Sequence, residues 1–267
     1  MKCISYILLS ASLIVNSCTS TPSAKQRVDV DSCGKSPGTS TCQSDGSDMI
    51  DSITTLQTSV VERIDTCHLM LLFPNYSRID LVCKDMPSSK DTSVILCAEA
   101  CFTGQCLNKF DHFNIAGDHV SAGHRHHGYR CNRNTGAFVW YGNKWEFLYK
   151  EYSKAMDEAS KMGGAAFAQE MIIHQGKLVA SIRKDSNTNQ FRALCEINGR
   201  LCIAESDSVI NYVEYISNLL KCGTREALHL DMGEGWNHAW YRISNDSIKI
   251  LHPKTHNFCT NWITFYK

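Results

Sequence analysis

Short apolar runs of strand length, each followed by a turn signal, restrict the fold of this chain more than any other feature. Such runs occur at residues 79–83, 94–98, 137–141, 144–147, 171–174, 177–182, 191–197, 200–204, 226–231, 239–243, 247–251 and 259–265. Asn198 and Gly199 separate two of the runs, and an Asn-Gly pair suits the type I′ turn of a β-hairpin. The pattern predicts a largely antiparallel sheet.

Two helices are expected, one over residues 148–162 and one over residues 208–221. The second is amphipathic, since apolar residues recur at spacings of three and four, and Asp207 or Ser208 is placed to cap its first amides. Its apolar stripe should cover one face of the sheet. The sequence therefore predicts an α+β fold: a single domain with a largely antiparallel, twisted sheet, or sheets, flanked by helices.

The first 17 residues have the pattern of an export signal. Lys2 precedes a short apolar run that is too brief to span a bilayer, and the run ends at Ser17 and Cys18. This order resembles a bacterial lipobox, which predicts that residues 1–17 are a signal peptide and that Cys18 carries the lipid. An ordinary secretory peptide followed by a chance cysteine is the alternative.

Residues 18–55 are rich in Ser, Thr, Gly, Asp and Pro and poor in large apolar residues, so they are expected to form a flexible tether. Residues 56–267 then form the folded domain. The protein is expected in the cell envelope, on the periplasmic or the outer-membrane face, with membrane contact through the lipid on Cys18.

Charge and cysteine content narrow the function further. The chain has 27 basic and 27 acidic residues, and loss of Lys2 with the signal peptide leaves 26 against 27, so no nucleic-acid partner is expected. Of 14 cysteines, Cys3 and Cys18 belong to export and lipidation, which leaves twelve in an oxidising compartment. Some of these should form disulfides. The chain contains no CxxC pair, so the cysteine spacing does not favour structural zinc. No cofactor is expected.

Three segments join strand ends to residues capable of acid, base or anion-binding chemistry: 98–104, 191–197 and 227–237. In the second, alternation puts Arg192 on the face opposite Phe191, so that Arg192 need not enter the core. In the third, Asp231 leaves an apolar strand into a turn that contains Gly233 and Gly235. Such a turn would expose Asp231 to a ligand.

The order of these segments over residues 78–242 resembles the phosphodiester glycosidase family, the N-acetylglucosamine-1-phosphodiester alpha-N-acetylglucosaminidase-like domains, in its Bacteroides-type lipoprotein branch. The family's Ala-Asn-Gly-Phe-like strand end reads Ala98 to Phe102 here, and its Arg-Thr-Ala-like strand reads Arg192 to Leu194. Its Leu-Asp-Gly-Gly-Gly-Ser turn reads Leu230 to Trp236, with Met232 and Glu234 in place of two glycines. The resemblance implies the family's fold and a hydrolase that acts on sugar phosphodiesters.

A sugar phosphodiester requires a cation for its phosphate and carboxyl groups for the reaction. We expect Arg192 to supply the cation and Asp231 the general base or nucleophile, with Glu99 or Glu234 as its carboxyl partner. A structural ion pair between Arg192 and Asp231 is the alternative.

Five histidines lie between Asp111 and Tyr129 in a loop punctuated by glycines. A substrate-binding loop, a solvated loop and a metal site that uses His119 with His124 or His126 are all compatible with this density. No metal is assigned. The predicted substrate-binding residues are Asp118, His119, His124, Gly233, Glu234 and Trp236.

The first hypothesis is thus an exported lipoprotein hydrolase, whose partner is a sugar phosphodiester or a related envelope glycoconjugate. A carbohydrate- or glycoconjugate-binding lipoprotein without catalysis is the second hypothesis. A metal-dependent hydrolase built on the His119–His127 loop is the third.

Overall fold

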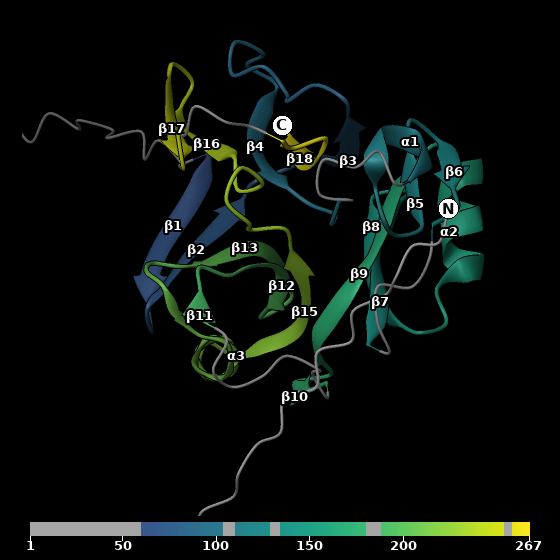
Figure 1. Ribbon diagram of the computed structural model, residues 1–267. Coiled ribbons are helices and arrows are strands. Elements are labelled where there is room, and N and C mark those ends of the chain that lie inside the picture. The colour runs from purple at the N-terminus through teal and green to yellow at the C-terminus, as the bar shows by residue number, and fades with distance from the viewer. Residues whose placement is uncertain (1–59, 104–109, 129–133, 180–187, 254–257) are drawn as a thin grey trace, which may run out of the picture. The chain divides into compact units, whose positions relative to one another are not determined.

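Antiparallel strands make up most of the fold (Figure 1). The computed structural model describes residues 60–103, 110–128, 134–179, 188–253 and 258–267. These residues belong to one unit of the chain, Thr55–Lys267. The predicted signal peptide, Cys18 and most of the predicted tether lie outside the described residues.

The largest sheet has eleven strands, all paired antiparallel. Its main path runs β1-β2-β13-β12-β15-β9-β5-β6, while β10 pairs with β9 and the hairpin β7-β8 joins through β7. Its strands are β1 (Val61–Thr66), β2 (Leu69–Pro74), β5 (His119–Ser121), β6 (His124–His126), β7 (Thr135–Tyr141), β8 (Lys144–Tyr149), β9 (Ala165–His174), β10 (Lys177–Leu178), β12 (Arg192–Ile197), β13 (Arg200–Ser206) and β15 (Thr224–Leu230).

The second sheet has five strands in the order β17-β16-β4-β18-β3. A short third sheet pairs β11 with β14. Their strands are β3 (Arg78–Cys83), β4 (Val94–Glu99), β11 (Thr188–Asn189), β14 (Ile210–Asn211), β16 (Ala239–Ser244), β17 (Ser247–Leu251) and β18 (Asn261–Tyr266).

The main core lies between the two large sheets. Ile95 and Ile263 of the five-stranded sheet join one cluster with Leu72, Leu194 and Leu228 of the eleven-stranded sheet. Side chains alternate along each strand, so the neighbours of Leu194 on β12 point to the opposite face. That face is buried as well, which explains why β12 reads as a nearly continuous apolar run.

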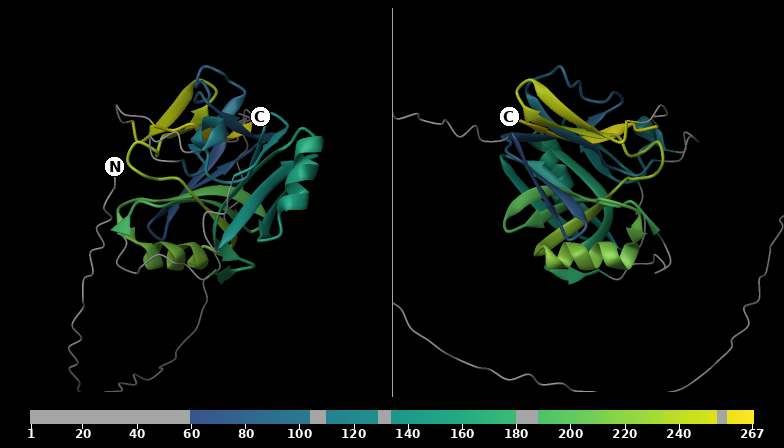
Figure 2. Two further views of the ribbon diagram at one scale, coloured as in Figure 1. Left: turned by 45° about the vertical axis from the view of Figure 1, so that its right-hand side comes forward. Right: turned by 90° about the vertical axis from the view of Figure 1, so that its left-hand side faces the viewer.

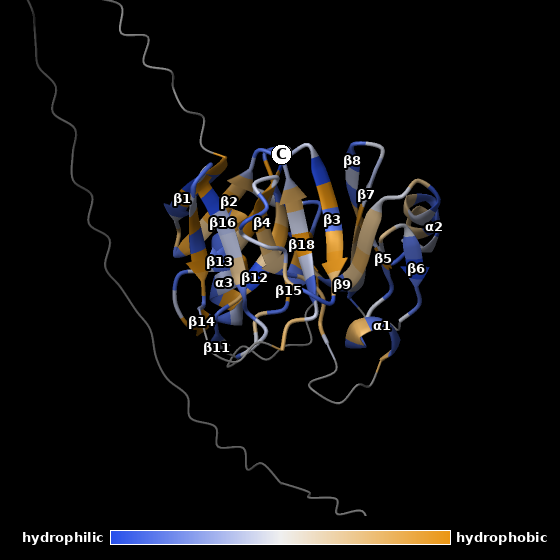
Figure 3. Cartoon of the chain, turned by 90° about the horizontal axis from the view of Figure 1, so that it is seen from above, coloured by the Kyte–Doolittle hydropathy of each residue, from blue (hydrophilic) through white to orange (hydrophobic). Residues whose placement is uncertain are grey.

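Three short helices complete the described structure: α1 (Asp111–Asn114), α2 (Ser153–Lys161) and α3 (Tyr212–Lys221). Tyr215 and Leu219 of α3 pack on Ala193 and Ala227, on the side of the large sheet away from the five-stranded sheet (Figure 2). Helix α2 covers the other end of that sheet, beside β5 and β7 (Figure 3). The predicted apolar stripe is confirmed only in part. Tyr212, Ile216 and Leu219 are buried, whereas Val209, Val213 and Leu220, at the same spacing of three and four, are exposed.

The predicted α+β class is wrong, because the fold is β-rich, with short helices added to large antiparallel sheets. Both expected helices begin later than predicted, because their first residues belong to strands. The segment expected to begin a helix at residue 148 continues β8 to Tyr149. The segment expected to begin a helix at Ser208 first forms β14, so that α3 begins at Tyr212.

The hairpin at Asn198 and Gly199 is confirmed. It joins β12 to β13, and its two turn residues have φ values of 51° and 74°. Type I′ turns require positive φ at both central positions, which Asn and Gly adopt at low cost.

Eight cysteines lie in the described residues, and no disulfide joins any two of them: Cys67, Cys83, Cys97, Cys101, Cys195, Cys202, Cys222 and Cys259. The expected disulfides are therefore not found in that part of the chain. The other four cysteines of the predicted mature chain lie outside it. Within the same residues, every helix is too short or too polar to cross a bilayer.

Candidate functional site

Two carboxyl-bearing strand ends come together at one end of the main core. Glu99 is the last residue of β4, and Asp231 directly follows β15. The Asp231 backbone N–H donates to the Ala100 carbonyl oxygen over 3.1 Å. This bond joins the two sheets and holds both acidic residues at the same place, as the sequence segments suggested.

Glu99 is fully buried, at 0% exposure. Its nearest polar neighbours are the Cys259 thiol and the Thr260 amide, and neither carboxyl oxygen has a well-formed hydrogen bond. Burial raises the pKa of Glu99 well above its ordinary value, and the nearby charge of Asp231 raises this pKa further. Burial thus favours the protonated form of Glu99.

Asp231 is the more easily ionised partner. Burial raises its pKa to about 6, while bonds from the backbone amides of Gly233, Met232 and Thr103 oppose this increase. The Met232 N–H lies 2.9 Å from the Asp231 carboxylate. Near pH 7, above its pKa of about 6, Asp231 is mostly ionised, whereas burial favours the protonated form of Glu99. This difference between the two groups suits acid–base chemistry.

Arg192 is fully buried, contrary to the expectation that it need not enter the core. Its Nε and Nη2 donate to Glu205 Oε2 at 2.8 and 2.7 Å, and Nη2 also donates to the Asn237 carbonyl oxygen at 3.0 Å. Glu205 in turn pairs with His252. The ion-pair partner of Arg192 is thus Glu205, although the guanidinium charge still lowers the pKa of both Glu99 and Asp231.

A pocket of about 530 Å³ adjoins the two carboxyl groups, and we call it the aromatic pocket. Its lining residues are Thr103, Phe110, Phe113, Asn114, Trp236, Phe258 and Thr260. Two of these connect it to the acids, because the Thr103 amide contacts Asp231 and the Thr260 amide contacts Glu99. None of the described lining residues carries a charge.

The aromatic pocket contains polar groups that are buried and unused. Among the described residues, the Trp236 indole Nε1 and the Thr260 hydroxyl have no hydrogen-bond partner. An unsatisfied buried group of this kind costs about 1–3 kcal/mol. Trp236 packs against Phe258, with ring centroids 4.9 Å apart, and these rings form an apolar wall.

Glycine is required in the turn that carries this wall. Gly235 has a φ of +83°, and a Cβ there would approach the Phe258 ring to 2.5 Å. Gly233 donates its N–H to Asp231, whereas Glu234 is exposed on the surface of the turn. Glu99, not Glu234, is therefore the carboxyl group that the structure brings to Asp231.

The remaining predicted substrate-binding residues lie elsewhere in the histidine-rich segment. Asp118 accepts bonds from the Gly128 amide at 2.7 Å and from Arg125 at 3.1 Å, so it fixes the β5-β6 hairpin. His124 is exposed, and His119 is buried. None of the three lines the aromatic pocket, which receives Phe110, Phe113 and Asn114 from the same segment instead.

One group of side chains in the described residues has the geometry of a metal site. The potential ligand atoms of His112, His119 and His126 all lie within 4.8 Å of one another. The sequence suggested His119 with His126 as one possibility but did not include His112.

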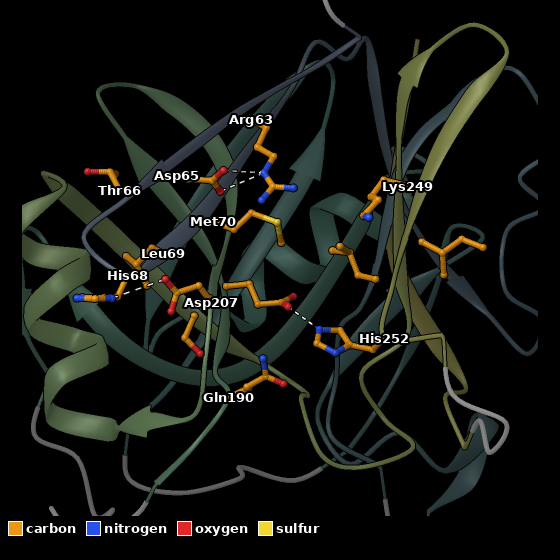
Figure 4. Close-up of a pocket in the computed structure, with 14 residues that line it drawn as sticks. Arg63, Asp65, Thr66, His68, Leu69, Met70, Gln190, Asp207, Lys249 and His252 are labelled. Carbon is orange, nitrogen blue, oxygen red and sulfur yellow. Dashed lines mark hydrogen bonds and ion pairs between the residues drawn. The ribbon is translucent and has the colours of Figure 1, made fainter.

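A second pocket, of about 710 Å³, is lined in part by Glu205, the ion-pair partner of Arg192. Figure 4 shows charged groups of both signs around it, including Arg63, Asp65, Asp207 and Lys249. His252 reaches Glu205 across its wall. The sequence did not predict this pocket, because its sides come from β1, β2, β13 and β17, which are distant along the chain.

Thr103, Thr260 and Phe258 were also missed. They are ordinary residue types with no motif of their own, and only the pairing of β18 with β4 brings residues 258–260 beside Glu99.

No protein-family model matches the chain, and no curated protein matches it in sequence. Its structure is similar to that of the zebrafish N-acetylglucosamine-1-phosphodiester alpha-N-acetylglucosaminidase catalytic domain, auto-inhibited by its pro-peptide. The TM-score is 0.53 at 9% identity, over 78% of this chain and 82% of that chain. A hypothetical protein from Synechocystis has a TM-score of 0.52 at 9% identity, over 78% of this chain and 61% of that chain, less than two thirds of its length. The chain thus has a phosphodiester glycosidase-like fold.

Proposed function

We propose that this protein is a hydrolase that cleaves the bond between a sugar and a phosphodiester group in the aromatic pocket. The observation that carries the proposal is the pair of carboxyl groups beside that pocket, the fully buried Glu99 and the partly buried Asp231, whose pKa values burial raises to different extents. The similarity in fold to a sugar-1-phosphodiester glycosidase supports the same class of substrate.

Asp231 is the reacting carboxylate in this proposal. It acts as a base that takes a proton from the attacking water, or as a nucleophile at the anomeric carbon. The bond between that carbon and the phosphate oxygen breaks, and the phosphate leaves with the bonding electrons. Glu99 is the member of the pair that holds a proton for the leaving oxygen, and the two groups titrate as a unit.

The aromatic pocket suits a sugar ring. The Trp236 and Phe258 rings offer an apolar surface for the ring face, while the Trp236 N–H and the Thr260 hydroxyl can bond its oxygens. Arg192 has a positioning role. Glu205 balances its charge, and the positive electrostatic potential that Arg192 still exerts at Asp231 favours the ionised form of that carboxyl group.

Binding without catalysis is the second candidate function. The observation that favours it is the absence of a charged side chain among the described lining residues of the aromatic pocket. A neutral glycoconjugate would need no cation there.

The test is an assay of the purified protein against sugar-1-phosphodiesters, with Asp231→Asn and Glu99→Gln as variants. Turnover should fall by about 100-fold or more in Asp231→Asn, because the amide is neither base nor nucleophile. Glu214→Gln is the matched control, since Glu214 is exposed on α3, outside both pockets.

Two outcomes would reject catalysis at this site. Full turnover in Asp231→Asn removes Asp231 from the mechanism. A wild-type protein that binds the phosphodiesters without cleaving any of them favours the binding function.

We also propose that the protein acts in the cell envelope, held to a membrane by lipid on Cys18, so that its substrate is an envelope glycoconjugate. The proposal rests on the order of Lys2, an apolar run, Ser17 and Cys18.

A further inference from the structure

The β5-β6 hairpin and the short segment α1 bring three histidines together. In the hairpin, His119 and His126 are register partners, so their side chains project from the same face. Their rings are stacked with centroids 5.0 Å apart. His112 of α1 stacks on His126 at 3.4 Å and lies 5.0 Å from the ring of His119.

The structure fixes the protonation of His119. This residue is 2% exposed, and its Nδ1 lies 2.9 Å from the Gly117 carbonyl oxygen, which can only accept a hydrogen bond. Nδ1 therefore carries the proton, and the lone pair of Nε2 points away from the backbone, to within 2.8 Å of His112 Nδ1. A backbone carbonyl that holds one ring nitrogen so that the other can bind a metal is a recurring feature of metal sites.

The cluster carries no carboxylate of its own among the three rings. The nearest carboxylate along the hairpin, Asp118, is already bonded to Arg125 and to the Gly128 amide. Each of the three imidazoles offers one nitrogen, and these nitrogens all lie within 4.8 Å of one another.

We propose that His112, His119 and His126 bind one divalent transition-metal ion of the class that prefers imidazole, with Zn²⁺ as the first choice. Zn²⁺ binds histidine nitrogen at about 2.0–2.1 Å, which places tetrahedral ligand atoms about 3.3 Å apart. The ligand atoms already lie within 4.8 Å of one another, and the stacked rings of His112 and His126 must turn apart so that both nitrogens face the ion.

When the ion binds, His112 changes its tautomer, but the neutral cluster loses no proton overall. Without the ion, the His112 Nδ1–H donates to His119 Nε2. With the ion, both nitrogens coordinate it through their lone pairs, and the His112 proton moves to Nε2 of the same ring by exchange with water. His112 is partly exposed, so water can reach its ring.

The ion would order one wall of the aromatic pocket. His112, Phe113 and Asn114 have successive positive φ values of 37°, 56° and 61°, a backbone conformation that non-glycine residues rarely adopt. Phe113 and Asn114 line the pocket, and the Phe113 ring lies 4.6 Å from the His112 ring. A bond from His112 to a metal would hold this unusual segment in place.

The experiment titrates the purified full-length protein, first freed of metal by a chelator, with Zn²⁺ and with Co²⁺. We expect one ion per chain, a visible Co²⁺ absorption typical of tetrahedral coordination, and a Tm increase of about 5–10 °C when free Zn²⁺ reaches 100 times its Kd.

His112→Ala and His126→Ala should each weaken Zn²⁺ binding by at least about 100-fold and abolish the Co²⁺ absorption. Both residues are partly exposed, so the variants should fold, and circular dichroism checks this. His127→Ala is the matched control, because His127 is exposed in the same segment and lies outside the cluster.

Two results would overturn the proposal: a wild-type protein that takes up no ion at stoichiometric concentration, or variants that bind Zn²⁺ as tightly as the wild type. Neither readout uses turnover, so the proposed hydrolase can fail without affecting this test.

Discussion

Protonation of Asp231 links the stability of the fold to pH. Its pKa of about 6 in the folded protein exceeds the ordinary value of 3.8. The proton therefore stabilises the folded state fully below pH 3.8, and this contribution is lost as the pH rises through about 6. The loss is at most about 3 kcal/mol at neutral pH.

Asp231→Asn should thus stabilise the protein, relative to the wild type, more at pH 7.5 than at pH 4. The amide cannot ionise, and its oxygen can still accept the Met232 N–H. We expect the variant to gain on the order of 1–3 kcal/mol over the wild type between these two pH values. Urea unfolding of both proteins at each pH measures the difference, and an equal difference at pH 4 and pH 7.5 would contradict the assigned pKa.

The ion pair between Arg192 and Glu205 leads to a prediction for Arg192 variants that differs from the one based on the sequence alone. Arg192→Met should destabilise the fold by about 3–5 kcal/mol, because it leaves the Glu205 charge buried. An effect on substrate affinity alone is not expected. The double variant Arg192→Met with Glu205→Gln should recover part of this loss, since it removes both charges.

Arg200→Met is the control for that measurement. Arg200 binds Glu62 at 2.8 Å with both side chains about half exposed, so its loss should cost less than about 1 kcal/mol. Urea unfolding compares the two single variants. Similar costs for both would show that the buried pair has no special role.

Among the elements, helix α3 shows how one local bond sets a boundary. Asn211 is its N-cap, and the Asn211 side chain accepts the Val213 N–H at 2.8 Å. The sequence favoured Asp207 or Ser208 for this role, yet the Ser208 hydroxyl donates to Asp207 instead. The helix begins later than expected because β14 uses the preceding residues to pair with β11.

Asn211→Ala should therefore destabilise the protein by about 1 kcal/mol, the usual cost of a lost N-cap. Ser208→Ala should have little effect. Thermal unfolding of the two variants distinguishes the caps, and a larger loss in Ser208→Ala would contradict the boundary at Tyr212.

For the whole molecule, the N-terminal region predicts attachment to a membrane. Cys18→Ala should leave the protein without lipid, because acyl transfer requires that thiol. Labelling of expressing cells with a fatty-acid analogue measures the modification. Cys33→Ala, in the predicted tether, should keep the label as a control. A Cys18→Ala protein that still carries the fatty acid would refute the predicted lipoprotein.

The sequence by itself determined the local features of this protein. Alternation and turn residues located most of the strands and the hairpin at Asn198 and Gly199, and spacing located half of the buried stripe of α3. These features depend on residues close together in the chain, whose preferences act before any tertiary contact forms. The sequence also selected Glu99 and Asp231 as candidate acids.

Only the tertiary structure decided how these parts combine. It placed Glu99 beside Asp231, gave Arg192 to Glu205, and brought His112 to the β5-β6 hairpin. The physical reason is that each arrangement depends on which strands are neighbours and in which register, and that choice is made by packing of the whole core. Burial then set the pKa values that distinguish the two carboxyl groups, and no sequence pattern records burial of that depth.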